Sequence, residues 1–137
     1  MKTLNPYLCF AGKTAQALAF YKDALQGEIV AQMTFGESGQ CPGAENAEGI
    51  MHSEFRAENI NFYATDGMPG QELVQGNAIT LCINFTDEAE QERVFNALGD
   101  KGQITTPLAD MFWGAKFGEV IDRFGVRWML NCHKTAG

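Results

Sequence analysis

Two acid–base side chains, His52 and Glu54, stand two residues apart within the stretch 50–56. In an extended strand, such a spacing places both side chains on one face. An imidazole beside a carboxylate can act as a base with its orienting acid, or as two ligands of a metal ion. The alternation also fits an ordinary strand with a solvated polar face, and this simpler interpretation is favoured. The opposite face would then carry Met51, Ser53 and Phe55.

Other residues could line a site for a small molecule. Phe112 and Trp113 precede a glycine, and the pair could form either an aromatic wall for a ligand or an anchor in a core or dimer contact. Arg127 would suit a carboxylate or phosphonate group if it faced a cleft, and would otherwise be a solvated edge residue. Asp122 precedes Phe124-Gly125, so we expect it to serve turn hydrogen bonding rather than catalysis.

Charge and composition exclude several classes of function. The 137 residues carry a formal net charge of −7 with a sequence pI near 4.7, which argues against nucleic acid and anionic membranes as partners. No apolar run approaches the ~20 residues of a membrane helix, and the first residues contain no apolar signal segment. We therefore expect a cytoplasmic protein. Its four cysteines form no CxxC motif, and reduced thiols are expected there.

The elements that would position these side chains occur in the same order twice. The first half predicts a helix over 15–25, capped by Thr14 and ended by Gly27, and strands at 7–11, 28–35, 50–56 and 60–65. The second half predicts a helix from Thr86 or Asp87 to Leu98, and strands at 78–85, 104–109, 116–122 and 126–132. Residues 36–49 lack large apolar side chains and predict a long loop that is functional or mobile.

Four residue pairs match at an offset of 75 between the halves: Phe10 and Phe85, Phe20 and Phe95, Gly27 and Gly102, Ile29 and Ile104. They fall at equivalent places, namely a strand end, a helix core, a helix stop and the start of the next strand. We therefore predict an α+β domain over 1–137 made of two βαβββ modules. Module one spans about 4–65, residues 66–77 connect, and module two spans about 78–133. Together they would form a curved, largely antiparallel sheet around a cleft, with the helices outside.

The sequence resembles the PhnB-like branch of the vicinal oxygen chelate superfamily, which includes glyoxalases, bleomycin-resistance proteins and dioxygenases. The resemblance runs over nearly the whole chain and is most specific near its end. Its motifs are Pro6-Tyr7-Leu8-x-Phe10-Ala11-Gly12, Ala19-Phe20-Tyr21, Thr34-Phe35-Gly36-Glu37, His52, Asp66-Gly67-Met68-Pro69, Phe112-Trp113-Gly114, Phe117-Gly118 and Asp122-Arg123-Phe124-Gly125-Val126 with Trp128-Met129. Methyl transfer, a label common in this branch, is not expected because the chain has no strand–glycine-rich turn–helix cofactor motif.

Metal-dependent members of the superfamily carry His or Glu ligands on the first and last strands of each module. In this chain the resemblance places those positions at Pro6, Phe62, Thr80 and Met129, which offer no good ligand for a divalent metal. It therefore implies that no cofactor or metal is bound. The residues expected to line a ligand site are Phe62, Thr80, Trp113, Arg127 and Met129.

Three functions follow as hypotheses. The first is a metal-independent small-molecule-binding protein, enzymatic or not, with no reaction assigned. The second is a metal-dependent lyase, isomerase or dioxygenase with a displaced site at His52, Glu54 and Glu72. The third is a protein that sequesters a toxic compound without turning it over, as bleomycin-resistance proteins do. A homodimer is expected from the resemblance and the abundance of aromatic residues.

Overall fold

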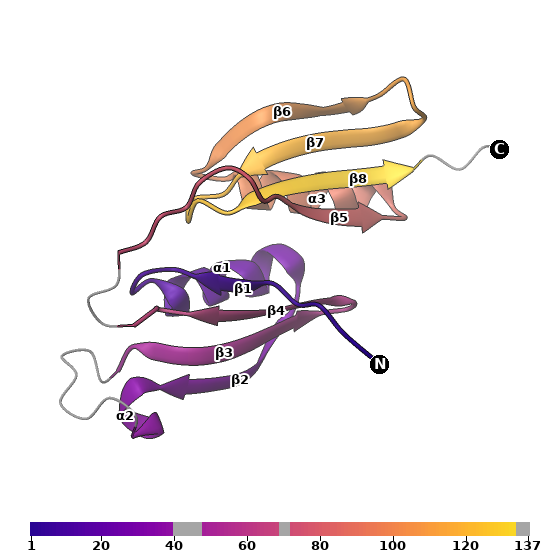
Figure 1. The fold of residues 1–137 in the computed structure, drawn as a ribbon. Coiled ribbons are helices and arrows are strands. Elements are labelled where there is room, and N and C mark those ends of the chain that lie inside the picture. Colours follow the sequence, from indigo (N-terminus) through magenta and orange to yellow (C-terminus); the bar gives the residue numbers. More distant parts are fainter. Residues whose placement is uncertain (40–47, 69–71, 134–137) are drawn as a thin grey trace. The chain divides into compact units, whose positions relative to one another are not determined.

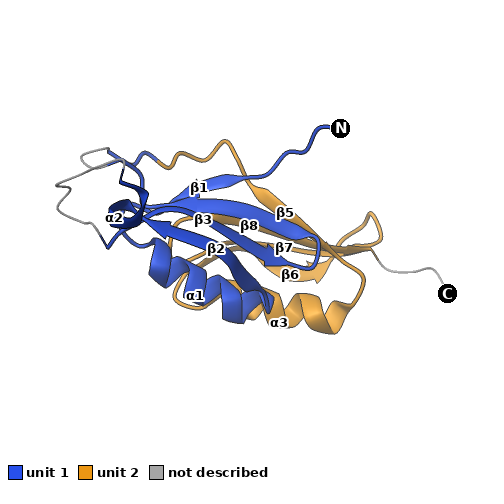
Figure 2. Cartoon of the chain, turned by 90° about the horizontal axis from the view of Figure 1, so that it is seen from below, with its two compact units in different colours: residues 1–74 blue, residues 75–137 orange. Residues whose placement is uncertain are grey.

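The computed structural model of the chain describes residues 1–39, 48–68 and 72–133. By the contacts within it, the chain divides into two compact units, Met1–Val74 and Gln75–Gly137, shown in different colours in Figure 2. Each unit contains one four-stranded sheet and one long helix (Figure 1). None of the helices in the described parts is long and apolar enough to cross a membrane.

Unit 1 follows the order strand, helix and three strands, with one short helical turn added. Its elements are β1 (Tyr7–Cys9), α1 (Thr14–Leu25), β2 (Glu28–Thr34), α2 (Phe35–Ser38), β3 (Ile50–Ala57) and β4 (Ile60–Thr65). The strand order is β1-β4-β3-β2, in which β1 runs parallel to β4 and the other pairs are antiparallel. The predicted module is therefore confirmed.

The core of unit 1 lies between α1 and one face of its sheet. Leu18 and Tyr21 of the helix are fully buried, and the Tyr21 ring meets the Phe62 ring edge-on at 5.5 Å between centroids. Phe62 in turn stacks on Phe55 at 4.9 Å. The helical stripe predicted from the spacing of apolar residues is thus the stripe that packs on the sheet.

Two local predictions in unit 1 are wrong. Thr14 does not cap α1; it is the first helical residue, and its backbone N–H donates to Oδ1 of Asp66 at 2.9 Å. The loop predicted over 36–49 begins with the turn α2, because Thr34 and Glu37 form a reciprocal capping box. Residues 40–47 of that loop lie outside the described residues.

Unit 2 repeats the plan of unit 1. Its elements are β5 (Leu81–Phe85), α3 (Glu88–Gly99), β6 (Gln103–Asp110), β7 (Ala115–Ile121) and β8 (Arg127–His133). The strand order is β5-β8-β7-β6, with β5 parallel to β8. The strand predicted at 78–85 is shorter than expected and begins at Leu81. Thr86 and Asp87 were the two predicted caps of the second helix, and Asp87 caps α3 by accepting a hydrogen bond from the Ala89 N–H.

The internal repeat has a physical basis at its two matching glycines. A Cβ on Gly27 would meet the carbonyl oxygen of Arg56 at 2.6 Å, and a Cβ on Gly102 would meet the carbonyl oxygen of Ile121. Arg56 lies near the end of the third strand of its module and Ile121 ends the third strand of the other. Both glycines therefore let the chain leave its helix close against the sheet, in the same way in each unit.

Candidate functional site

Each sheet has one face covered by its own helix and one face that the helix does not cover, which we call the open face. In unit 1 the residues on β3 and β4 alternate between these faces, with Ser53, Phe55, Phe62 and Ala64 buried on the helix side. The strand register places side chains in rows across the open face. The first row contains Asn61 and Arg56, and the second contains Tyr7, Tyr63 and Glu54. The third row contains Cys9 and Thr65, with His52 beside them on β3.

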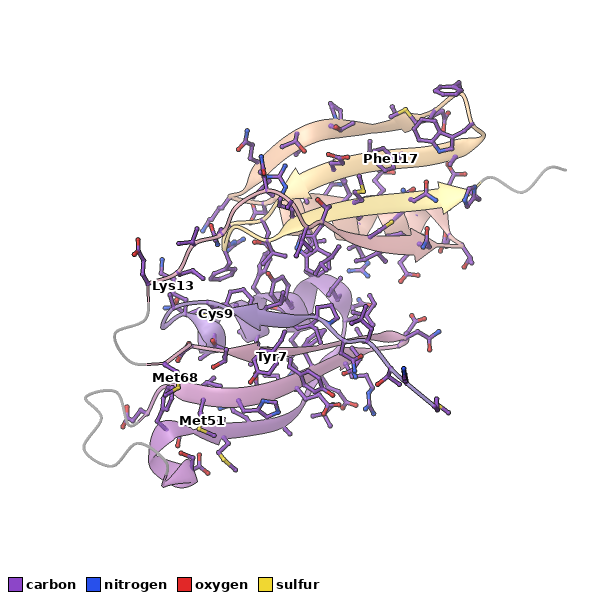
Figure 3. The ribbon with its side chains drawn as sticks, viewed as in Figure 1. Tyr7, Cys9, Lys13, Met51, Met68 and Phe117 are labelled. Atoms are coloured by element: carbon purple, nitrogen blue, oxygen red, sulfur yellow. The ribbon has the colours of Figure 1, made fainter. Side chains whose placement is uncertain are left out.

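Three rings form a cluster on this open face. The ring centroids of Tyr7, His52 and Tyr63 lie 5.7, 5.8 and 5.5 Å apart in the pairs Tyr7–His52, Tyr7–Tyr63 and His52–Tyr63. The Tyr7 hydroxyl is hydrogen-bonded to Nδ1 of His52 at 2.9 Å. The cluster joins β1, β4 and β3; Figure 3 shows Tyr7 and Cys9 on the first of these strands.

Partial burial raises the pKa of the Tyr7 hydroxyl, although the residue as a whole is exposed, and the nearby Cys9 raises it further. A phenol with a raised pKa keeps its proton at neutral pH. The Tyr7–His52 pair therefore combines a protonated phenol with an imidazole, two groups that can donate and accept protons.

The structure does not pair His52 with Glu54, which was the less favoured interpretation of their spacing. Glu54 and His52 do share the open face, but the Glu54 carboxylate accepts from Arg56 at 3.1 Å, while the imidazole is bonded to Tyr7. Sequence reasoning missed Tyr7 because its contact with His52 depends on β1 lying next to β4. The signal that could have found it is the alternation of Tyr7 and Cys9 along the first strand.

The open face of unit 2 has different chemistry at the equivalent positions. The register aligns Cys82, Met129 and Glu119 in one row, and Asn84, Asn131 and Phe117 in the next. The Asn131 amide donates to the Asn84 side-chain oxygen at 3.3 Å. Trp113, in the turn between β6 and β7, meets the ring of Phe117 edge-on at 5.8 Å (Phe117 is labelled in Figure 3). Sulfur, amide and aromatic groups therefore replace the acid–base pair of unit 1.

The residues predicted to line a ligand site lie in different environments. Arg127 and Met129 alternate with the buried Trp128 and Leu130, so both are on the open face of β8. Thr80 is half-buried just before β5. Phe62 is 1% exposed and packs in the core of unit 1, while its neighbour Tyr63 occupies the open face. The ligand-binding roles of these residues stay predictions, and the geometry favours Tyr63 over Phe62.

Metal ligands are scarce on the open faces. Among the described residues, no group of three or more His, Cys, Asp or Glu side chains lies close enough to hold a metal ion. In the row that crosses the first and last strands of each module, the open face carries Tyr7 and Tyr63 in unit 1 and Cys82 and Met129 in unit 2. Of these four residues, Cys82 alone is a usual zinc ligand. Glu72, the third residue of the predicted displaced site, is exposed outside any helix or strand. The residues present do not fit the metal site of the superfamily.

Comparisons with known proteins identify the family. The family described as 3-demethylubiquinone-9 3-methyltransferase matches residues 2–131. The crystal structure of protein PA1353 from Pseudomonas aeruginosa has a TM-score of 0.87 and 34% identity, covering 98% of this chain and 100% of that chain. A putative 3-demethylubiquinone-9 3-methyltransferase, PhnB protein, from Bacillus cereus has a TM-score of 0.80 and 29% identity, covering 96% and 99%.

The bleomycin resistance determinant encoded on transposon Tn5 shares the fold alone, with a TM-score of 0.61 and 14% identity over 98% of this chain and 100% of that one. The family match, the similar structures and the paired βαβββ modules agree. The chain belongs to the 3-demethylubiquinone-9 3-methyltransferase (PhnB-like) family.

Proposed function

We propose that this protein binds a small organic molecule at the open face of the unit 1 sheet, without a divalent metal. The observation that supports the proposal is the cluster of Tyr7, His52 and Tyr63, whose rings lie within 6 Å of one another. Sites for small molecules combine apolar and aromatic surface with a few polar groups that fix orientation. The cluster offers both, on strands that hold its members in register.

Stability alone is a poor reason for this arrangement. The Tyr7–His52 hydrogen bond is exposed, and Tyr7 is 54% exposed overall. Water competes for such a bond, so its net contribution to folding is about 1 kcal/mol or less. Polar aromatic groups that are linked and accessible, but contribute little to the core, are those expected at a binding surface.

The metal-free part of the proposal is tested by elemental analysis of protein purified without chelators or added metals. We expect zinc, nickel, iron and manganese to be far below one ion per chain, with no change in His52→Ala. A stoichiometric metal that is lost in His52→Ala, but kept in His133→Ala, would instead support the metal-dependent alternative at His52, Glu54 and Glu72.

The binding part is tested by thermal unfolding in the presence of a panel of neutral aromatic ketones and phenols. A compound that binds only the folded state stabilises it by mass action, by about 2.7 kcal/mol at 100 times its dissociation constant. We expect at least one compound to stabilise the wild type and Phe112→Ala but not Tyr63→Ala. Phe112 is the matched control because it is an exposed aromatic residue in a turn of unit 2. Equal stabilisation of both variants would contradict the site.

Turnover separates an enzyme from a sequestering protein. A bound compound that is recovered unchanged after prolonged incubation would identify sequestration, and a product would identify catalysis. Methyl transfer, the activity in the family description, is not part of the proposal, because the chain has no glycine-rich cofactor motif. A cytoplasmic location is proposed from the free thiols of Cys9, Cys82 and Cys132.

A further inference from the structure

The Tyr7–His52 pair has more hydrogen-bonding capacity than its one bond uses. Tyr7 comes from β1 and His52 from β3, and their contact spans the intervening strand β4. The bond joins the phenol oxygen to Nδ1. The other ring nitrogen, Nε2, has no hydrogen bond to any residue in the parts of the chain that the structure describes. The described residues therefore leave hydrogen-bonding capacity unused at both Nε2 and the phenol oxygen.

Two proton arrangements satisfy the observed bond. In the first, the Tyr7 O–H donates to Nδ1, and Nε2 carries the imidazole proton. In the second, the Nδ1–H donates to the Tyr7 oxygen, Nε2 has a free lone pair, and the Tyr7 proton points away from the ring. Each arrangement presents one donor and one acceptor to a ligand, with the two roles exchanged between the atoms.

No charged side chain of the neighbouring described strands is bonded to Tyr7 or His52. The nearest carboxylate on β3, Glu54, is already paired with Arg56 at 3.1 Å. β4 contributes Tyr63 and β1 contributes Cys9, while β2 places the uncharged Met33 opposite His52. The raised pKa of Tyr7, caused first by burial and then by Cys9, keeps the phenol protonated at neutral pH. The protonated phenol can therefore donate its O–H to a bound molecule, and a ring nitrogen without a proton can accept one.

We propose that Tyr7 and His52 form a proton relay that tautomerises a neutral aromatic carbonyl compound with an acidic C–H. This inference rests on the proposed binding site and assigns a substrate class to it. Starting from the second arrangement, Nε2 takes the proton of the ligand C–H, and the electrons of that bond form the enol double bond. The Nδ1 proton passes to the Tyr7 oxygen, and the Tyr7 proton passes to the carbonyl oxygen. The pair ends in the first arrangement, with all protons and electrons accounted for and no oxidant, reductant or metal required.

The test uses 2-indanone, a neutral aromatic ketone with acidic C–H bonds next to its carbonyl. Its exchange of those protons for deuterium in D₂O is followed by proton NMR, with the full-length protein as catalyst. General acid–base catalysis by positioned side chains contributes about 10²- to 10⁴-fold. We therefore expect an exchange rate at least about 10²-fold above an equimolar mixture of imidazole and phenol. His52→Gln and Tyr7→Phe should each return the rate to the level of that mixture.

The double variant distinguishes a relay from a structural role. Because both residues act in one proton chain, His52→Gln with Tyr7→Phe should be no slower than either single variant. His133→Gln, the control at the other histidine, should keep the wild-type rate. Thermal stabilisation by 2-indanone in the two single variants shows whether they still fold and bind. Retained binding with lost exchange supports the relay.

The relay and the binding site fail in different ways. Wild-type protein that is stabilised by 2-indanone, but exchanges its protons no faster than the mixture, would refute the relay and leave the binding site intact. Exchange that survives in His52→Gln would also refute the relay. No stabilisation and no exchange with this probe would overturn the assigned substrate class. The panel of aromatic ketones and phenols tests the binding site separately.

Discussion

Asp122 holds the turn between β7 and β8, and removing its carboxylate should destabilise unit 2 strongly. One oxygen, Oδ1, accepts from the backbone N–H groups of Phe124 at 2.8 Å and Val126 at 3.1 Å. The other, Oδ2, accepts from the indole N–H of Trp128 at 2.9 Å. Asp122 is 3% exposed and Trp128 1% exposed, so water cannot replace the indole contact. The turn predicted from the sequence thus depends on one buried carboxylate.

The expected cost of Asp122→Ala follows from these three bonds. Hydrogen bonds to a charged group contribute about 1.5–3 kcal/mol each, and a buried donor left unpaired costs about 1–3 kcal/mol. The two backbone N–H groups lie in a half-buried turn and can partly recover bonds to water, whereas the Trp128 N–H cannot. We therefore expect a loss of about 3–5 kcal/mol in the free energy of unfolding. This corresponds to a fall in Tm of about 10 °C or more.

Urea unfolding of a Trp113→Phe background, followed by the fluorescence of Trp128, measures this quantity in unit 2. The matched control is Asp100→Ala, because Asp100 also pairs with a neighbour, Arg123 at 2.9 Å, but its side chain is 64% exposed. Exposed pairs contribute about 0–1 kcal/mol, so the control should stay within about 1 kcal/mol of its parent. If Asp122→Ala lost no more than Asp100→Ala, the assignment of the turn to this carboxylate would be wrong.

Further predictions concern packing, thiols and assembly. Gly118→Ala should lower the free energy of unfolding in urea by about 1–3 kcal/mol, because the new Cβ would lie 2.6 Å from the Phe95 ring. In the control Gly99→Ala the new Cβ would lie 3.3 Å from its nearest neighbour, so its stability should stay within about 1 kcal/mol of wild type. Equal losses in the two variants would contradict this packing. Burial raises the pKa of both the Cys132 and the Cys82 thiols, but Cys132 is 2% exposed whereas Cys82 is exposed. Because a reagent cannot reach a buried thiol, Cys132 should react at pH 7 much more slowly than Cys82, as peptide mapping would show. The edge strand β2 is exposed and could pair with a second copy of the chain, so light scattering at micromolar concentration should find a dimer. A monomer would contradict pairing through this edge.

The repeated modules could be predicted because their signals are local. The amphipathic helices, the glycines at their ends and the turn residues each depend on neighbours a few positions away. The four residue pairs that match at an offset of 75 then indicated that the two halves share one fold, and this inference needed no knowledge of tertiary contacts. The start of α1 was missed because its first N–H is satisfied by Asp66, about fifty residues away, rather than by a neighbouring side chain. Thr14 has the right residue type for a cap, but tertiary structure supplies the acceptor.

The site was harder to predict because it depends on strand register. A shift of one residue along a strand moves every side chain to the other face. The family resemblance placed a site position at Phe62, which lies in the core, whereas Tyr63 lies on the open face. The hydrogen bond between Tyr7 and His52 also requires β1 to lie beside β4, and no spacing within the sequence encodes that neighbour.

The internal repeat allows the two open faces to be compared position by position. In the row that crosses β1, β4 and β3, Tyr7, Tyr63 and Glu54 correspond to Cys82, Met129 and Glu119 of unit 2. His52, two residues before Glu54, corresponds to Phe117, two residues before Glu119. The carboxylate is therefore retained, while the phenol and the imidazole have no counterpart.

This difference limits where proton transfer can occur. The two modules share one packing plan, but one open face carries a linked phenol and imidazole and the other carries thioether, thiol and phenyl groups. In the proposed relay unit 1 exchanges protons with a ligand, whereas the open face of unit 2 supplies sulfur and aromatic contacts beside the Glu119 carboxylate. Met129→Leu, which preserves apolar volume, should therefore leave the deuterium exchange of 2-indanone within a few-fold of wild type, while His52→Gln should lower it to the rate of the imidazole–phenol mixture. The reverse result would place the chemistry in unit 2 and refute the division of roles.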